Sequence, residues 1–183
     1  MQEINIIALI CGIYFLIAFI TTSILKKYSF KKEVLSKYAL GKYSWIMFLA
    51  FLATITEEFL LGFQFIQEDS VFSGLFLIIA GIGMCLVTFI RYEGSKNKRK
   101  IHEIGAMIQF ISFPLALLSL YIMNQDKFSL IIGSITIILA TLIIPLNKEY
   151  LKGKITNYGL IQKINILLMD FWLIITPAVR LFW

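Results

Sequence analysis

The chain has 183 residues, of which 59% are hydrophobic and only 15% are charged, and its formal net charge is +6. Soluble domains average about 25% charged residues, and the apolar excess here falls in blocks of roughly 20 residues, enough to cross about 30 Å of hydrocarbon. These values exclude an ordinary soluble domain. They also argue against nucleic-acid binding, because most lysines and arginines lie between the apolar blocks, where they set membrane topology.

Six membrane-spanning helices are predicted, because backbone groups in lipid must be satisfied within each segment. We place the helices at about 4–25, 44–66, 72–91, 104–123, 128–146 and 158–182. The connections are too short to hold a soluble domain, so we expect one transmembrane domain over residues 1–183, folded as an all-α, compact six-helix bundle. The acidic start and the long first apolar run favour a retained first span over a cleaved signal peptide.

Charge alternates from one connection to the next. The first, third and fifth connections carry 14 of the 17 lysines and arginines, whereas the second and fourth carry one. By the positive-inside rule, the basic connections face the cytoplasm and both termini face outward. Two interpretations of the first connection, residues 26–43, stay open: a solvated basic loop that fixes topology, or a short amphipathic segment lying on anionic lipid.

Ionisable side chains within the spans are the candidate functional groups, because each costs about 2.5–3.5 kcal/mol to insert and such groups usually face the bundle interior. Glu57 and Glu58 lie in the second span, and Asp170 lies in the sixth. Glu57 and Asp170 are each roughly 18–20 Å from the inner face, at 1.5 Å per residue. We therefore expect them to share a polar cavity in the outer half of the membrane, with at least one carboxyl neutral.

Helical spacing places Thr54 and Gln64 on the same side of the second span as Glu57. Glu57 is therefore predicted to face the cavity, with Glu58 beside it. Two interpretations of these polar groups stay open. They form a site for a ligand or a proton, or they form a structural knot that holds the helices together.

Polar residues near the span ends give further candidates. We expect Lys163 to reach cytoplasmic headgroups, and Arg180 to reach a lipid phosphate or the acidic second connection. His102, the chain's single histidine, is predicted at the cytoplasmic mouth of the fourth span, with Gln109 along the same face. One histidine excludes a bis-histidine haem and a histidine-rich metal cluster, and common catalytic motifs are missing, so we expect no metal and no cofactor.

Three segments follow patterns of a known family. Residues 101–120, IHEIGAMIQFISFPLALLSL, match H-x-x-x-A-x-x-x-F-x-x-x-P-x-A, and residues 35–52, LSKYALGKYSWIMFLAFL, match S-x-Y-x-x-G-x-x-x-W. Residues 159–174, GLIQKINILLMDFWLI, are similar to the last helix of that family. With these segments the chain resembles the bacterial and archaeal membrane proteins grouped as domain of unknown function 998.

The resemblance implies a six-helix integral membrane protein without an assigned reaction. It draws attention to Arg91 and Glu93, which resemble an Arg…Asp pair of the family. Together with His102 and Gln109, they form a predicted cluster at the cytoplasmic mouth. The alternative for this cluster is a network of helix ends and lipid headgroups.

Three classes of function fit the sequence. The preferred class is a protein that binds a lipid, another hydrophobic ligand or a membrane protein partner within the bundle. The second is a small proton-coupled transporter that uses Glu57, Glu58 and Asp170. The third is a membrane-embedded, lipid-modifying enzyme with His102 or a carboxyl as acid or base. The expected partners are membrane lipids and a membrane protein or a second copy of this chain, without nucleic acid. A bias toward Lys, Ile and Leu favours a prokaryotic plasma membrane.

Overall fold

The computed structural model describes residues 1–27, 31–90, 95–151 and 157–182. Within these ranges the long helices are α1 (Gln2–Lys26), α2 (Ser44–Gln67), α3 (Val71–Phe89), α4 (Lys96–Asn124), α5 (Lys127–Leu151) and α6 (Tyr158–Phe182), with a short 3-10 helix, η1 (Leu35–Ala39). The same ranges contain no strand. All six long helices are long and apolar enough to cross a membrane. The predicted class, an all-α bundle of six membrane-spanning helices, is confirmed.

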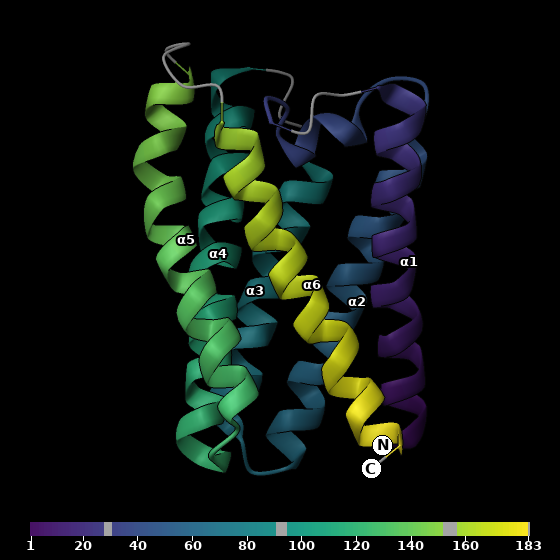
Figure 1. Ribbon diagram of the computed structural model, residues 1–183, viewed down its shortest axis with the longest axis vertical. Coiled ribbons are helices and arrows are strands. Elements are labelled where there is room, and N and C mark those ends of the chain that lie inside the picture. The colour runs from purple at the N-terminus through teal and green to yellow at the C-terminus, as the bar shows by residue number, and fades with distance from the viewer. Residues whose placement is uncertain (28–30, 91–94, 152–156, 183) are drawn as a thin grey trace.

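The helices form a closed arrangement, in which each packs against its neighbours in the sequence and α6 packs back against α1 (Figure 1). Both chain termini lie at one end of the bundle, which we name the terminal end. The connections that carry most of the lysines and arginines lie at the opposite end, which we name the basic end. Figure 1 also shows α6 crossing the bundle obliquely, from beside α5 at the basic end to beside α1 at the terminal end.

Glycines bring the central helices into close contact. A Cβ atom on Gly83 of α3 would lie 2.7 Å from the carbonyl oxygen of Gly105 of α4, and one on Gly105 would lie 2.7 Å from that of Gly83. Gly62 of α2 and Gly74 of α3 make a similar approach. Lipid supplies no hydrophobic force between helices, so such small residues allow the close packing on which membrane bundles depend.

Helix α4 begins eight residues before the predicted start of the fourth span, at Lys96. The side chain of Ser95 accepts a hydrogen bond from the backbone nitrogen of Lys98, at 3.5 Å, and so caps the helix at this point. The sequence prediction followed the apolar block, but a helix can continue beyond the hydrocarbon as long as its backbone is satisfied. For the same reason α5 continues past residue 146, to Leu151.

The first connection folds into the bundle, which differs from both interpretations offered above. Its residues 31–40, which we name the cap segment, include η1. The backbone nitrogen of Leu35 donates to Gln162 Oε1 of α6 at 3.0 Å, and that of Leu160 donates to the carbonyl of Lys31 at 3.2 Å. The buried apolar side chains of the segment are Val34, Leu35 and Tyr38. They enter the basic end because burying them there removes apolar surface from water.

Candidate functional site

The two adjacent glutamates of α2 point toward different helices, as their 100° separation requires. Glu58 passes Gly81 of α3, where an added Cβ would lie 3.5 Å from Glu58 Cβ, and its Oε1 accepts a hydrogen bond from Gln109 Nε2 of α4 at 3.3 Å. Glu57 faces α1, where a Cβ on Gly12 would lie 3.1 Å from Glu57 Oε1. Both glutamates are 0% exposed. Gly12 on the neighbouring helix makes room for Glu57, whereas the approach of Glu58 to Gly81 is an ordinary contact.

Asp170 of α6 joins the glutamates near the middle of the bundle. Both Asp170 and Glu58 lie close enough to Glu57 for their carboxyls to interact with it electrostatically. Several carboxyl oxygens in this cluster have no hydrogen-bond partner among the residues that the structure describes: both oxygens of Glu57, Oε2 of Glu58 and Oδ1 of Asp170. The structure therefore brings together the three carboxyls that the sequence singled out, and it leaves them with unused capacity to accept hydrogen bonds.

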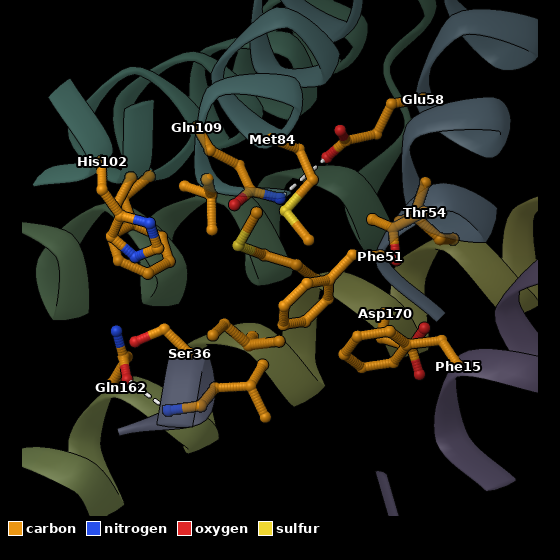
Figure 2. Close-up of a pocket in the computed structure, with 17 residues that line it drawn as sticks. Phe15, Ser36, Phe51, Thr54, Glu58, Met84, His102, Gln109, Gln162 and Asp170 are labelled. Atoms are coloured by element: carbon orange, nitrogen blue, oxygen red, sulfur yellow. Dashed lines mark hydrogen bonds between the residues drawn. The ribbon is translucent and has the colours of Figure 1, made fainter. Parts of the chain in front are cut away.

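A hollow of about 50 Å³, which we name the deep hollow, lies beside this cluster. Its polar lining residues include Thr54, Glu58, Gln109, His102, Gln162 and Asp170. Aromatic rings of Phe15, Phe51 and Phe110 line it as well. In Figure 2, Glu58, Thr54 and Asp170 stand on one side of the hollow, and His102, Ser36 and Gln162 stand on the other. Glu58 rather than Glu57 faces the hollow, because Glu57 is turned toward α1.

Two further hollows adjoin the deep one. The side hollow, of about 400 Å³, lies between α4, α5 and the start of α6, and the upper hollow, of about 220 Å³, lies between the cap segment, α2 and α3. Ser36 and His102 line all three hollows. The Nδ1 atom of His102 lies 2.8 Å from the carbonyl oxygen of Ile90, which can only accept, so this nitrogen carries the proton. The three hollows therefore share Ser36 and His102 as lining residues.

The position of these hollows differs from the expected one, because the cavity was predicted toward the end that holds both termini. The deep hollow extends from the carboxyls in mid-bundle to Ser36 and His102 at the basic end. On the predicted topology, this is the cytoplasmic side. The depth of Glu58 and Asp170 along their helices could be counted from the sequence. The direction in which the hollow extends depends on how the cap segment and α4 pack. Counting residues along a helix does not give this packing.

Gln64 belongs to a separate network at the terminal end. Its Nε2 donates to Glu68 Oε1 at 2.9 Å, and Arg180 Nη1 of α6 donates to both oxygens of Glu68 at 2.6 Å. The guanidinium of Arg180 also lies over the ring of Phe65, 4.6 Å from its centroid. Of the two partners expected for Arg180, the structure shows the acidic connection. Thr54, by contrast, lines the deep hollow as part of the predicted polar face.

Lys163 differs from its prediction. It is 1% exposed, its Nζ donates to the carbonyl of Glu33 at 2.5 Å, and it lies over the ring of Tyr38 at 5.0 Å. The cap segment thus covers Lys163, which holds that segment in place rather than reaching headgroups. Arg91 and Glu93, the remaining members of the predicted mouth cluster, lie outside the described residues.

Sequence reasoning on chemistry alone missed Ser36 and Gln162, which line the hollows beside His102. A signal was available, because the three segments that carried the family resemblance contain these three residues. Within the described ranges, no group of three or more His, Cys, Asp or Glu side chains is arranged to hold a metal ion.

The geometry defines a class: a six-helix membrane-spanning bundle with an acidic, aromatic-lined interior hollow that extends to one end of the helices. The family described as protein of unknown function (DUF998) matches residues 9–178 of the chain. The protein therefore belongs to that family, and the resemblance seen in the sequence is confirmed. No curated protein and no solved structure matched the chain.

Proposed function

We propose that the protein binds a single-chain amphipathic molecule within the helix bundle. The observation that carries this proposal is that three neighbouring hollows share Ser36 and His102 in their linings. The side hollow, at about 400 Å³, falls within the range of ligand pockets, about 300–1,000 Å³, and fits an apolar chain. The deep hollow supplies a few polar groups among aromatic rings, the usual surroundings of a ligand's polar head.

The lipid phase is the route of entry in this proposal. Met107 of α4 lines the side hollow and is 42% exposed. The side hollow is also lined by Ile143 and Ile144 of α5. A molecule dissolved in the bilayer could therefore insert between α4 and α5 without first crossing water.

Photo-crosslinking tests the proposal. Purified protein in phosphatidylcholine vesicles is irradiated with a diazirine-bearing analogue of dodecanol, and the labelled peptides are mapped by mass spectrometry. Saturable labelling of residues around the side hollow is expected, with competition by unlabelled dodecanol. Ala106, which lines both the deep and the side hollows, is replaced by Trp to fill them, and labelling should be lost.

The matched control is Ile104→Trp, on the same helix. Ile104 lies on the exposed face and lines none of the three hollows, so saturable labelling should persist. Labelling that rises linearly with probe concentration, or that is equal in Ala106→Trp and the parent protein, contradicts a binding cavity.

Proton-coupled transport is a second candidate, supported by the buried and unpaired oxygens of Glu57. A carboxyl within the membrane that can gain and lose a proton is a typical element of such transporters. In reconstituted vesicles with an imposed pH gradient, the parent protein should carry a proton flux that Glu57→Gln abolishes. The absence of flux in the parent protein removes this candidate and leaves the binding proposal unchanged.

A further inference from the structure

The chemistry of the hollows restricts the head group of the proposed ligand. Glu58 Oε2 and Asp170 Oδ1 are buried and unpaired, and both residues line the deep hollow. No lysine or arginine lines any of the three hollows within the described part of the chain. A phosphate or carboxylate head would therefore meet carboxyls and find no cation to pair with it.

A head that carries positive charge and N–H donors fits the same surroundings. An unpaired carboxylate in a low-dielectric interior gains most from a charged donor, which supplies both a hydrogen bond and a countercharge. The rings of Phe15, Phe51 and Phe110 line the deep hollow. Aromatic faces attract cations, so these rings favour an ammonium group over a neutral or anionic one.

The size of the deep hollow restricts the head further. At about 50 Å³ of free space, with roughly 10–15 Å³ needed for each water-sized group, it holds only a few heavy atoms. A primary amine and its first carbons fit in this space. A sugar or a phosphate-linked head exceeds it.

From these three restrictions we infer that the bound molecule is a long-chain primary amine, whose ammonium group donates hydrogen bonds to the carboxyl of Glu58, with that of Asp170 as the second acceptor. Gln109 Nε2 donates to Oε1 of Glu58 at 3.3 Å and so fixes the carboxyl beside the hollow. The inference rests on the proposed binding function and specifies its ligand class.

Competition with the diazirine probe tests the inference in phosphatidylcholine vesicles, which lack anionic lipid that would concentrate amines. Dodecylamine should displace the probe at a concentration about tenfold lower than dodecanol, since a charged hydrogen bond contributes at least that factor. Dodecanoic acid should compete more weakly than dodecanol. Dodecyltrimethylammonium, which carries the charge but lacks N–H donors, should show a smaller advantage than dodecylamine.

Variants locate the effect. Glu58→Gln, which keeps the shape of the side chain, should remove the advantage of dodecylamine, and Asp170→Asn should reduce it. Glu3→Gln removes a carboxyl from the first turn of α1 and should leave the advantage intact. A thermal denaturation scan of each variant identifies any that fail to fold, and the comparison of probes on the parent protein needs no variant.

The outcomes are distinct. Equal competition by dodecylamine and dodecanol in the parent protein overturns the amine inference while the binding proposal stands. An advantage equal for dodecyltrimethylammonium, or one that persists in Glu58→Gln, also overturns it, because the head would then lie elsewhere. Labelling by the probe that cannot be saturated overturns the binding proposal itself, and the amine inference with it.

Discussion

Gln109 Nε2 donates a hydrogen bond to Glu58 Oε1 across 3.3 Å and so joins α4 to α2 at the centre of the bundle. The bond satisfies one oxygen of a fully buried carboxyl, whose other oxygen has no partner in the described structure, and the residue lines the deep hollow. It thus links the packing of the helices to the candidate site.

Replacing Gln109 by Leu should lower the free energy of unfolding by about 1–3 kcal/mol, because both Glu58 oxygens would then be buried without a partner. The double variant Gln109→Leu with Glu58→Met should recover most of this loss, since it removes both polar partners together. Denaturation by SDS in mixed micelles measures the free energy of unfolding of the parent, the two single variants and the double variant. A double variant no more stable than Gln109→Leu contradicts this account of the pair.

Replacing Glu57 by Met should leave stability unchanged or raise it. Glu57 is fully buried and neither of its oxygens has a partner in the described structure, so its removal breaks no hydrogen bond. A buried polar group without a partner costs about 1–3 kcal/mol, so an apolar replacement of similar shape should be neutral or stabilising. The apparent melting temperature in detergent is the measurement. A clear decrease in melting temperature would contradict the absence of a stabilising partner for Glu57.

Replacing Gly105 by Leu should prevent α3 and α4 from packing. The added Cβ alone would lie 2.7 Å from the carbonyl oxygen of Gly83, so the helices must separate. Size-exclusion chromatography should show aggregated protein and a low yield. Thr56→Leu places the same leucine side chain on an exposed face of α2 and should elute as the parent does. Normal behaviour of Gly105→Leu would contradict the close approach.

Replacing Lys163 by Met should release the cap segment. Lys163 donates to the carbonyl of Glu33 and lies over the ring of Tyr38, which is itself fully buried. Chymotrypsin should therefore cut after Tyr38 several-fold faster in the variant, because cleavage requires the backbone to leave its site. Lys42→Met, an exposed change beside the cap segment, is the control and should leave the rate unchanged.

Cysteine labelling tests the predicted orientation. The native Cys11 and Cys85 are first replaced by Ala, and a single cysteine is then introduced at Lys98 or at Asn124, at opposite ends of α4. The positive-inside rule places the basic end in the cytoplasm. A membrane-impermeant maleimide applied to intact cells should therefore modify the cysteine at position 124 and spare the one at 98. The reverse labelling pattern would contradict the predicted orientation and place the basic end outside the cell.

Much of the architecture could be predicted because it depends on local composition. An apolar run long enough to cross the hydrocarbon must form a helix, and six such runs appear in the sequence without reference to any other part of the chain. The clustering of Glu57, Glu58 and Asp170 followed from counting their depths along two helices. The depth of a residue in the membrane depends mainly on its distance along the helix axis, so it can be estimated by counting residues.

The direction of each side chain could not be predicted in the same way. Glu57 and Glu58 are adjacent, and the sequence favoured Glu57 for the cavity on the polarity of its face. In the structure, Glu57 packs against Gly12 of α1, and Glu58 lines the hollow instead. The first connection was misjudged for a related reason. Its lysines indicated a surface location, but Val34, Leu35 and Tyr38 fit a space that exists only once α1, α2 and α6 have packed.

The sequence by itself determined that the chain is a membrane protein, how many spans it has and how deep the polar groups lie. These properties follow from hydropathy and from the rise of a helix along its axis. Only the tertiary structure decided that Glu58 faces the hollow, that Lys163 holds the cap segment and that Ser36, His102 and Gln162 meet at its mouth. Those relationships depend on how each helix is rotated about its axis. Helix rotation is fixed by close packing against glycines far away in the sequence.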